Sequence, residues 1–244
     1  MSNPLSHVPR APCNIDSLKG LPFIPKKPLP AKSFAMYIVG HPGSGKTNLW
    51  NSMMISKSPL YYRGFFHHVD LISGSLGTIS EKVLKHLPKD QQHHALSDDL
   101  MNHLIDSLRY GSGKNGNNLL ILDDVIKDIK ASKELSKVFL NRRHCTHDPN
   151  RKGQAGLSIM VTSQKYSLLP LEFRGACDHI ILFRTANASE IKKIRDELMQ
   201  DLDRHTQLQV LKIAWARPYS FLMIRANAST EERYFVKFDR IVIT

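Results

Sequence analysis

Short runs of apolar residues, each of strand length, recur along the chain and alternate with stretches of helical periodicity. The apolar runs cover 34–39, 119–122, 157–161 and 179–183, and 65–73 is a further strand candidate with polar residues among its apolar ones. Continuous apolar runs of this kind are typical of strands that are buried on both faces of a sheet. Their alternation with helices predicts one α/β domain with a mostly parallel central sheet flanked by helices.

Between these runs, apolar side chains recur at the three- and four-residue spacing of a helix face. The predicted helices cover 48–56, 78–87, 97–108, 131–141 and 189–203. Pro59 and Pro88 end the first two, because proline cannot continue a helix. Nearer the C-terminus, residues 215–224 and 234–243 have the composition of strands, which predicts a C-terminal β-hairpin.

The first strand leads into a glycine-rich loop with a phosphate-binding pattern, G-x-x-x-x-G-K-[ST]. Its residues are Gly40, His41, Pro42, Gly43, Ser44, Gly45, Lys46 and Thr47. A strand before the loop and a helix after it aim backbone N–H groups and a positive helix end at an anion. Lys46 would reach the β- and γ-phosphates, and the Thr47 hydroxyl would ligate Mg²⁺. The loop therefore predicts a purine triphosphate site that takes ATP with Mg²⁺.

Two carboxylates, Asp123 and Asp124, follow the apolar run 119–122 directly. They would lie at the carboxyl edge of the sheet, where open α/β sheets bind their ligands. In an ATP site Asp123 would hold Mg²⁺, directly or through water, and Asp124 would orient or deprotonate the attacking water. A strand that ends in two aspartates can also cap the next helix. The pair therefore indicates an ATP site only in combination with the phosphate loop.

A polar segment, Thr162-Ser-Gln164, follows the apolar run 157–161. A side-chain amide at the end of such a strand can contact the γ-phosphate or position a water molecule. Gln164 is therefore the candidate sensor of the nucleotide state.

The charge balance of the chain is unusual, whereas its content of hydrophobic residues is ordinary. Lys and Arg number 34 against 22 Asp and Glu, giving a net charge of +12 and a pI near 9.7. A surplus of this size favours a polyanionic partner, above all nucleic acid, although solubility alone would also explain it. Residues 1–33 hold seven of the thirteen prolines, which predicts an extended basic arm ahead of a single domain over 34–244.

Cysteine usage and apolar run length indicate the compartment. Cys13, Cys145 and Cys177 are widely spaced and odd in number, so no disulfide framework follows and a reducing compartment fits. No apolar run approaches the length of a transmembrane helix, so no transmembrane segment is expected.

Taken together, the order of these motifs resembles the FtsK–HerA superfamily of DNA-pumping ATPases. The likeness is greatest to the poxvirus-type genome-packaging ATPases of large DNA viruses, virophages and Polinton-like elements, and it covers roughly residues 34–184. The segments that carry it are the phosphate loop, Leu71-Ile-Ser73, Leu122-Asp-Asp124, Arg143-His144, Thr162-Ser-Gln164, 171–174 and 178–183.

The resemblance implies a RecA-like core and a homo-oligomeric ring, a hexamer or a pentamer, with double-stranded DNA in its pore. It implies ATP-driven translocation of that DNA into a viral capsid, with capsid or membrane-vertex proteins as further partners. The implied location is the host cytoplasm or a viral factory, or the virion itself.

The same resemblance implies roles for individual residues. Lys46 and Thr47 would contact phosphate and Mg²⁺, the two aspartates would form the Walker B pair, and Gln164 would be the sensor. The implied arginine finger, which acts on the site of a neighbouring subunit, is Arg143, with Arg142 and Arg174 as rivals.

Two other readings of the phosphate loop remain open. A small-molecule or nucleoside kinase of this size would also carry such a loop, and it would transfer the γ-phosphate to an acceptor without stimulation by DNA. A non-hydrolysing, nucleotide-dependent binding protein would bind ATP without turnover, with an inert Asp124.

Overall fold

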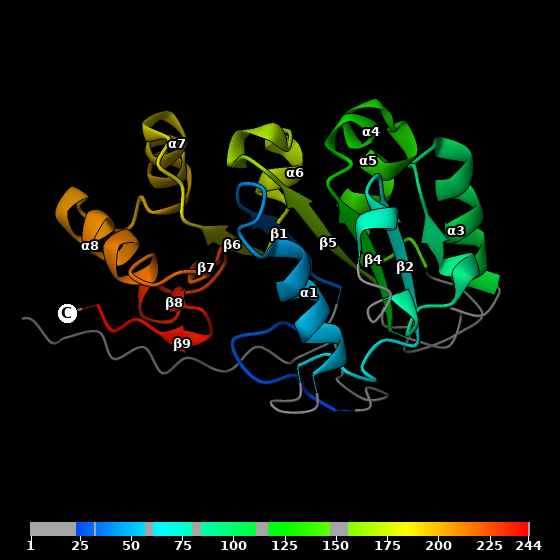
Figure 1. Ribbon diagram of the computed structural model, residues 1–244, viewed down its shortest axis with the longest axis horizontal. Helices are drawn as coiled ribbons and strands as arrows, with labels where there is room; N and C mark the ends of the chain where they lie inside the picture. Colours follow the sequence, from blue (N-terminus) through cyan, green and yellow to red (C-terminus); the bar gives the residue numbers. More distant parts are fainter. Residues whose placement is uncertain are drawn as a thin grey trace, which may run out of the picture.

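The computed structural model describes residues 23–31, 33–56, 61–79, 84–110, 117–146 and 156–243. In this part of the chain nine strands form one sheet in the order β3-β2-β4-β5-β1-β6-β7-β8-β9 (Figure 1). The strands are β1 (Ala35–Val39), β2 (His68–Ser73), β3 (Gln92–His93), β4 (Asn118–Asp123), β5 (Leu157–Ser163), β6 (His179–Phe183), β7 (Phe221–Arg225), β8 (Tyr234–Val236) and β9 (Asp239–Arg240). Strands β1 to β6 pair in parallel, and β7, β8 and β9 continue the sheet as antiparallel neighbours.

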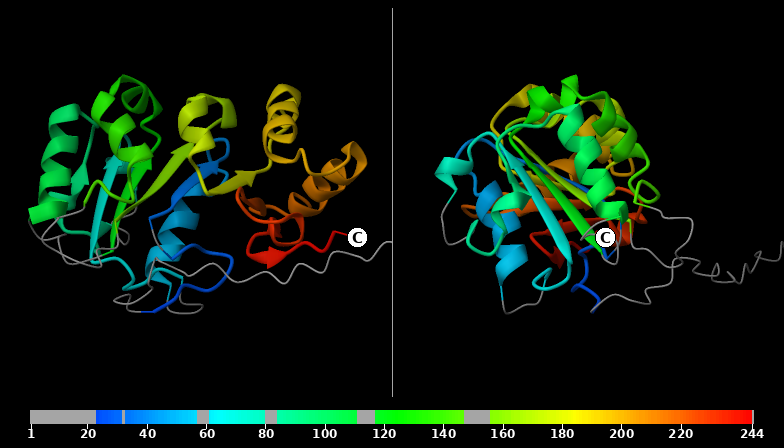
Figure 2. Two further views of the ribbon diagram at one scale, coloured as in Figure 1. Left: turned by 180° about the vertical axis from the view of Figure 1, so that it is seen from behind. Right: turned by 90° about the vertical axis from the view of Figure 1, so that its right-hand side faces the viewer.

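Helices pack against both faces of the sheet (Figure 2). The α-helices are α1 (Lys46–Ile55), α3 (Asp98–Tyr110), α4 (Ile126–Ala131), α5 (Lys133–Leu140), α6 (Leu171–Gly175), α7 (Ala188–Leu198) and α8 (Arg204–Ala214). Short 3₁₀ turns cover Leu76–Thr78, Lys89–Gln91, Tyr166–Leu168 and Thr230–Glu232. One face carries α1, and the other carries α3 to α8, so the sheet separates two hydrophobic cores.

Alternation along the central strand β1 shows why both faces are covered. Tyr37 belongs to the core under α3 to α8, whereas Ile38 belongs to the core with Trp50 and Met53 of α1. Both side chains are fully buried. Because successive strand residues point to opposite faces, a strand that is apolar at every position requires a packed layer on each side.

The expected fold class is confirmed, with a mostly parallel sheet, flanking helices and antiparallel strands at the C-terminus. The helices expected at 97–108, 131–141 and 189–203 correspond to α3, α5 and α7. Of the helix expected over 78–87, residues 80–83 lie outside the described residues.

The C-terminal region differs in detail from the expected hairpin. Residues 215–220 are not part of a strand, and Arg204–Ala214 instead forms a helix, α8, that the sequence pattern did not predict. Asp203 caps it by accepting hydrogen bonds from the N–H groups of His205 and Thr206. The Trp215 indole donates to the Leu182 carbonyl oxygen at 2.9 Å, which fixes the end of α8 on the sheet.

The segment ahead of β1 is partly described. Within 23–31, Leu29 is buried, and the ring of Phe23 packs edge-on against Phe65 at 5.4 Å. Residues 1–22 lie outside the described residues, so the basic arm expected for 1–33 stays a prediction. Within the described ranges no helix has both the length and the apolar character needed to cross a membrane.

Candidate functional site

The glycine-rich loop joins the carboxyl end of β1 to α1 near the middle of the sheet. β1 is paired with β5 on one side and β6 on the other, and the Gly40 N–H donates to the Ser163 carbonyl oxygen at 3.0 Å. Gly43 and Gly45 have φ values of 76° and 101°. These left-handed conformations are readily adopted only by glycine, so the path of the loop depends on these two residues.

Close packing at the start of the loop also requires glycine. A Cβ atom on Gly40 would lie 2.4 Å from Ser44 Oγ and 2.8 Å from Phe183 Cβ, too close for either contact. The Ser44 hydroxyl is buried and has no hydrogen-bond partner among the described residues. A buried hydroxyl of this kind favours a polar ligand, so this end of the loop fits a phosphate group.

Lys46, the first residue of α1, folds back over the loop. Its ammonium group donates to the carbonyl oxygens of Gly40 at 2.8 Å and His41 at 3.3 Å. Burial lowers the pKa of Lys46, and the negative charges of Asp124 and Asp123 oppose this shift. The lysine therefore lies within electrostatic reach of both aspartates. Thr47 follows it in the first turn of the helix and is partly exposed.

Asp123 ends β4 and is held by polar residues of the two adjacent strands. It pairs in register with Ser73 of β2 and Thr162 of β5. Thr162 Oγ1 donates to Asp123 Oδ1 at 2.8 Å, and Ser73 Oγ donates to Oδ2 at 3.4 Å. The carboxylate is only 3% exposed. Burial raises the pKa of Asp123, and the hydrogen bond from Thr162 counteracts this rise.

Asp124 points away from the strand because its backbone is left-handed, with φ of 57°. Its N–H donates to Thr162 Oγ1 at 3.1 Å, and its Oδ2 atom accepts a hydrogen bond from Gln164 Nε2 at 3.0 Å. Both Asp124 and Gln164 are exposed at the sheet edge. The two strand ends therefore present a carboxylate and an amide as one hydrogen-bonded unit.

The oxygen donors at this edge fit Mg²⁺. The ion prefers oxygen ligands and usually takes only one or two carboxylates from the protein, with water and phosphates completing the shell. Asp123 supplies the buried carboxylate, and Thr47 stands next to Lys46 on the loop side. No group of three or more His, Cys, Asp or Glu residues suited to a metal occurs in the described part of the chain.

Of the three arginines considered as fingers, Arg142 is buried and engaged within its own chain. Its guanidinium donates to Asp178 Oδ2 at 2.6 Å and to the carbonyl oxygens of Ser33 and Phe139 at 2.9 and 3.3 Å. The Arg142 carbonyl oxygen also accepts a hydrogen bond from the N–H of Leu157, at the start of β5. It therefore lies at the edge of the sheet opposite the phosphate loop.

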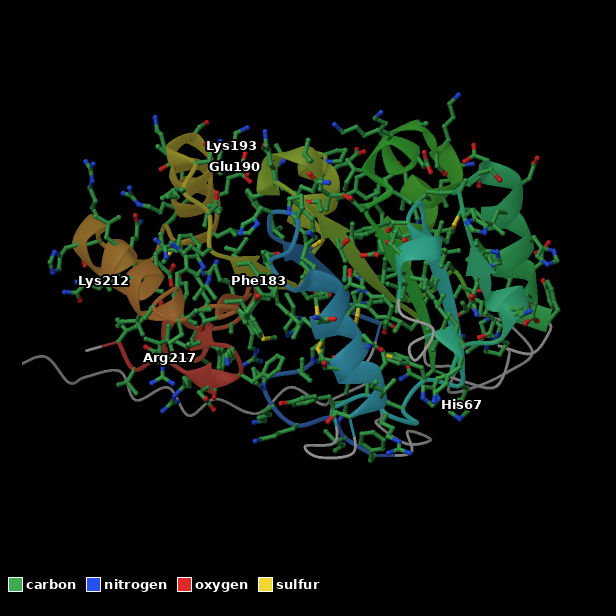
Figure 3. All side chains as sticks on the ribbon, viewed as in Figure 1. His67, Phe183, Glu190, Lys193, Lys212 and Arg217 are labelled. Atoms are coloured by element: carbon green, nitrogen blue, oxygen red, sulfur yellow. The ribbon has the colours of Figure 1, made fainter. Side chains whose placement is uncertain are left out.

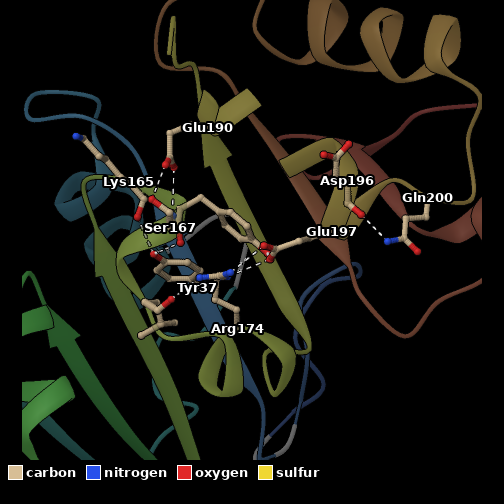
Figure 4. Close-up of polar contacts among 10 residues, drawn as sticks. Tyr37, Lys165, Ser167, Arg174, Glu190, Asp196, Glu197 and Gln200 are labelled. Carbon is tan, nitrogen blue, oxygen red and sulfur yellow. Dashed lines mark hydrogen bonds and ion pairs between the residues drawn. The ribbon is translucent and has the colours of Figure 1, made fainter. Parts of the chain in front are cut away.

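Arg174 of α6 is also buried and engaged. Its guanidinium forms two hydrogen bonds to Glu197 of α7, at 3.1 and 2.8 Å, and lies over the Tyr166 ring (Figure 4). Ser167 and Glu190 make a second link from the segment after Gln164 to α7. Neither Arg142 nor Arg174 is available to another subunit in this arrangement.

Arg143 is exposed, unlike its two rivals. It follows Arg142 directly and so lies at the same edge of the sheet, away from the loop of its own chain.

Sequence reasoning missed the residues that position the candidate groups. Thr162 contacts both Asp123 and the backbone of Asp124, and Ser73 supports Asp123 from the other side. The two strands that flank β4 both end in hydroxyl residues, Ser73 in β2 and Thr162-Ser163 in β5, and this was the available signal. Its meaning depends on the strand order β2-β4-β5, which the sequence does not give.

The fold is shared with solved structures of low sequence identity. The genome packaging NTPase B204 from Sulfolobus turreted icosahedral virus 2, in complex with sulfate, is 18% identical, has a TM-score of 0.59, and matches over 88% of this chain and 99% of its own. The structure of the same NTPase in complex with ATP-gammaS is also 18% identical, with a TM-score of 0.59, and matches over 87% of this chain and 98% of its own. The pCW3 conjugation coupling protein TcpA, in a monomer form with ATPgS, is 14% identical with a TM-score of 0.52, over 84% of this chain and 61% of its own.

Sequence comparison identifies the family. A search of curated protein sequences gave no match. Residues 23–238, which include the loop, both strand-end aspartates, Arg143 and Gln164, match the family described as poxvirus A32 protein. The resemblance to poxvirus-type ATPases drawn from the motifs is therefore confirmed, and the chain belongs to the poxvirus A32 protein family.

Proposed function

We propose that this protein hydrolyses ATP and uses the energy to move double-stranded DNA into a viral capsid. The observation that carries the proposal is the convergence of Lys46, Asp123 and Asp124 at one sheet edge in a chain of the poxvirus A32 family. The B204 structures, which share the fold, are named as those of a genome packaging NTPase.

In this proposal the loop binds the phosphates of ATP. Backbone N–H groups of 43–47 and the positive end of α1 attract the negative charge, and Lys46 exchanges its contacts with the loop carbonyls for the β- and γ-phosphates. Thr47 and Asp123 would hold Mg²⁺, which would neutralise phosphate charge. The hydrogen bonds from Thr162 and Ser73 keep the Asp123 carboxylate in place for this task.

Asp124 and Gln164 act on the attacking water. The carboxylate accepts a hydrogen bond from the water, orients it and takes its proton as the water attacks. The amide that now contacts Asp124 turns towards the γ-phosphate. The left-handed backbone of Asp124 aims this carboxylate out of the strand and into the site.

Arg143 completes the site of a neighbouring subunit in a ring. Three features support this role: the side chain is exposed, its rivals Arg142 and Arg174 are engaged internally, and it lies at the opposite sheet edge from its own loop. A guanidinium supplied across an interface stabilises the charge that develops in the transition state. The ring, a hexamer or a pentamer, surrounds the DNA and works in the host cytoplasm or a viral factory.

The net charge of +12 supports DNA as the partner. Lysine and arginine side chains would contact phosphates without reading bases, so DNA affinity should fall steeply as the salt concentration rises.

The test is steady-state ATP hydrolysis by the full chain with and without linear duplex DNA, at low and physiological salt. We expect DNA to stimulate hydrolysis, more strongly at low salt. Hydrolysis that DNA does not change would contradict the translocation role. Transfer of the γ-phosphate to a small acceptor would favour a kinase, and tight ATP binding without turnover would favour a nucleotide-dependent binding protein.

A further inference from the structure

A cavity of about 650 Å³ opens directly beside the phosphate loop. Lys46 and Thr47 line it on one side, and Tyr219, Lys237 and Phe238 line it on the side of the C-terminal strands. This volume lies within the range of roughly 300–1,000 Å³ that small-molecule sites occupy. Because the loop forms one wall, a ligand that places phosphates on the loop extends naturally into this cavity.

Aromatic rings form the floor of the cavity. Phe221 of β7 packs against Phe183 and Phe238 at ring distances of 5.4 Å each, and Tyr61 packs against Phe238 at 5.1 Å. Figure 3 shows Phe183 between α1 and the C-terminal strands. These contacts fix a rigid apolar surface at the point where β6 meets the antiparallel part of the sheet.

Tyr219 stands at the mouth of this cavity and is 72% exposed. Its ring nevertheless lies close to the loop, since a Cβ atom placed on Gly45 would be 3.6 Å from Tyr219 Cδ1. A large exposed aromatic ring next to a phosphate loop leaves a π-face open for a flat ligand.

Backbone strain occurs at two residues of the same cavity. Tyr219 and Lys237 both have φ of 56°, which is uncommon for residues other than glycine. Within the described residues, only Ser33 and Asp124 among the other non-glycine residues share a positive φ. Strained residues cluster at ligand sites because the strain fixes the direction of a side chain. Here it brings an aromatic ring and an ammonium group to the same opening.

We propose that this cavity binds the purine base of the nucleotide, stacked on the Tyr219 ring, with Lys237 contacting acceptor atoms of the base or the ribose. This assignment rests on the proposed function, because it requires the phosphates to lie on the loop. It adds a base subsite built by Tyr219 in the segment before β7, by Phe221 of β7 and by the turn between β8 and β9. Stacking area sets the selectivity, so purine nucleotides bind more tightly than pyrimidine nucleotides.

The test compares three ligands by isothermal titration calorimetry on the full chain: Mg·ATP, Mg·CTP and Mg·tripolyphosphate, which has phosphates but no base. In the wild type we expect ATP to bind more tightly than CTP, and CTP more tightly than tripolyphosphate. Loss of a stacked aromatic ring weakens base binding by about 10-fold or more. The variant Tyr219→Ala should therefore weaken ATP binding by about this factor and leave tripolyphosphate binding unchanged. The difference in affinity between ATP and CTP should become smaller.

Two variants serve as matched controls. Tyr219→Phe keeps the ring and should retain ATP affinity. Tyr110 on α3 is similarly exposed, at 66%, and does not line the cavity, so Tyr110→Ala should change none of the three affinities.

Equal loss of ATP and tripolyphosphate binding in Tyr219→Ala would overturn the stacking assignment, as would unchanged ATP affinity. A wild type that binds tripolyphosphate as tightly as ATP would also overturn it while leaving the phosphate loop intact. A wild type that binds none of the ligands would overturn the proposed function, and the base subsite with it.

Discussion

At the scale of single residues, Asp124 shows how a strand end can turn a carboxylate out of the sheet. A strand that continued in extended form would place successive side chains on opposite faces of the sheet. The left-handed backbone at Asp124 breaks this alternation. Thr162 stabilises that conformation because its hydroxyl oxygen accepts a hydrogen bond from the Asp124 N–H. Asparagine and aspartate tolerate this backbone better than other side chains do, so the position suits a carboxylate.

This geometry yields a prediction for Asp124→Asn. Asparagine fits the same backbone and keeps an oxygen for Gln164, but it cannot accept a proton from water. We expect ATP binding to persist and turnover to fall by about 10²–10⁴-fold. Equilibrium titration of ATP together with a phosphate-release assay measures both quantities.

The variant Lys46→Ala is the matched control, because it removes the ammonium group that contacts the loop. It should lose ATP binding itself, and turnover as a consequence. Normal hydrolysis in Asp124→Asn would remove Asp124 from the catalytic step.

At the scale of elements, Asp178 ties three of them together. Its Oδ2 atom accepts hydrogen bonds from Arg142, which follows α5, and from the N–H of Ala35 in β1, and it directly precedes β6. The ion pair is largely buried, with the Arg142 side chain 7% and the Asp178 side chain 18% exposed. This junction holds the amino end of the strand that carries the phosphate loop.

Removal of one partner should therefore destabilise the fold. Arg142→Ala leaves a buried carboxylate without its counter-charge, and we expect a loss of about 3–5 kcal/mol in the free energy of unfolding. The neighbouring exposed Arg143 provides the control, since Arg143→Ala should change stability by no more than about 0.5 kcal/mol. Urea denaturation of both variants measures the difference, and similar midpoints would contradict the structural role of Arg142.

His179, the first residue of β6, predicts a pH dependence of stability. Burial lowers its pKa from 6.5 to about 4, with Asp178 opposing the shift and Arg225 reinforcing it. Between these two values the unfolded chain binds a proton that the folded chain does not. Stability contributed by the neutral imidazole is therefore present above pH 6.5 and is lost as the pH falls towards 4, by roughly 2 kcal/mol at pH 5.

The variant His179→Gln tests this contribution. Glutamine keeps a hydrogen-bond donor but does not titrate, so its stability should fall less than that of the wild type between pH 7.5 and pH 5. Unfolding free energies from urea titration at the two pH values give the comparison. Equal losses in both proteins would show that His179 does not titrate in this range.

Much of this arrangement could be predicted from local sequence, and the rest depends on neighbours distant in the chain. The loop, the aspartate pair and Gln164 follow strand-length apolar runs, so their common edge follows from the rules of parallel sheets. Helix α8 was missed because its buried stripe includes the polar Gln207, whereas the apolar Leu208 and Ile213 lie on its exposed side. The engagement of Arg142 was not predictable either, because its partner Asp178 is distant in sequence. Likewise, the cavity beside Lys46 combines residues from near both ends of the described chain.

At the scale of the whole molecule, the phosphate loop and Arg143 lie at opposite edges of the sheet. Under the proposed role, a single subunit cannot complete its own site, so hydrolysis depends on assembly. We expect Arg143→Ala to bind ATP normally and to lose turnover by about 10³-fold or more.

Mixing experiments can test this arrangement. Rings made of Arg143→Ala and Asp124→Asn subunits contain some interfaces where an intact Asp124 faces an intact Arg143. Hydrolysis by the mixture should therefore exceed that of either variant alone, as measured by phosphate release at equal total protein. A mixture no more active than its parts would contradict a role for Arg143 across the interface.

The strand order also has a consequence for the time course of synthesis. β1 is the first strand to be made, yet both of its neighbours, β5 and β6, are encoded much later. About 140 further residues must be translated after Val39 before Phe183 is available, which takes roughly 7–30 s at ribosomal rates. The aromatic wall from Tyr219 to Phe238 follows later still. A nascent or truncated chain thus carries the phosphate-binding sequence without the sheet that shapes it, and nucleotide can stabilise only chains that are nearly complete.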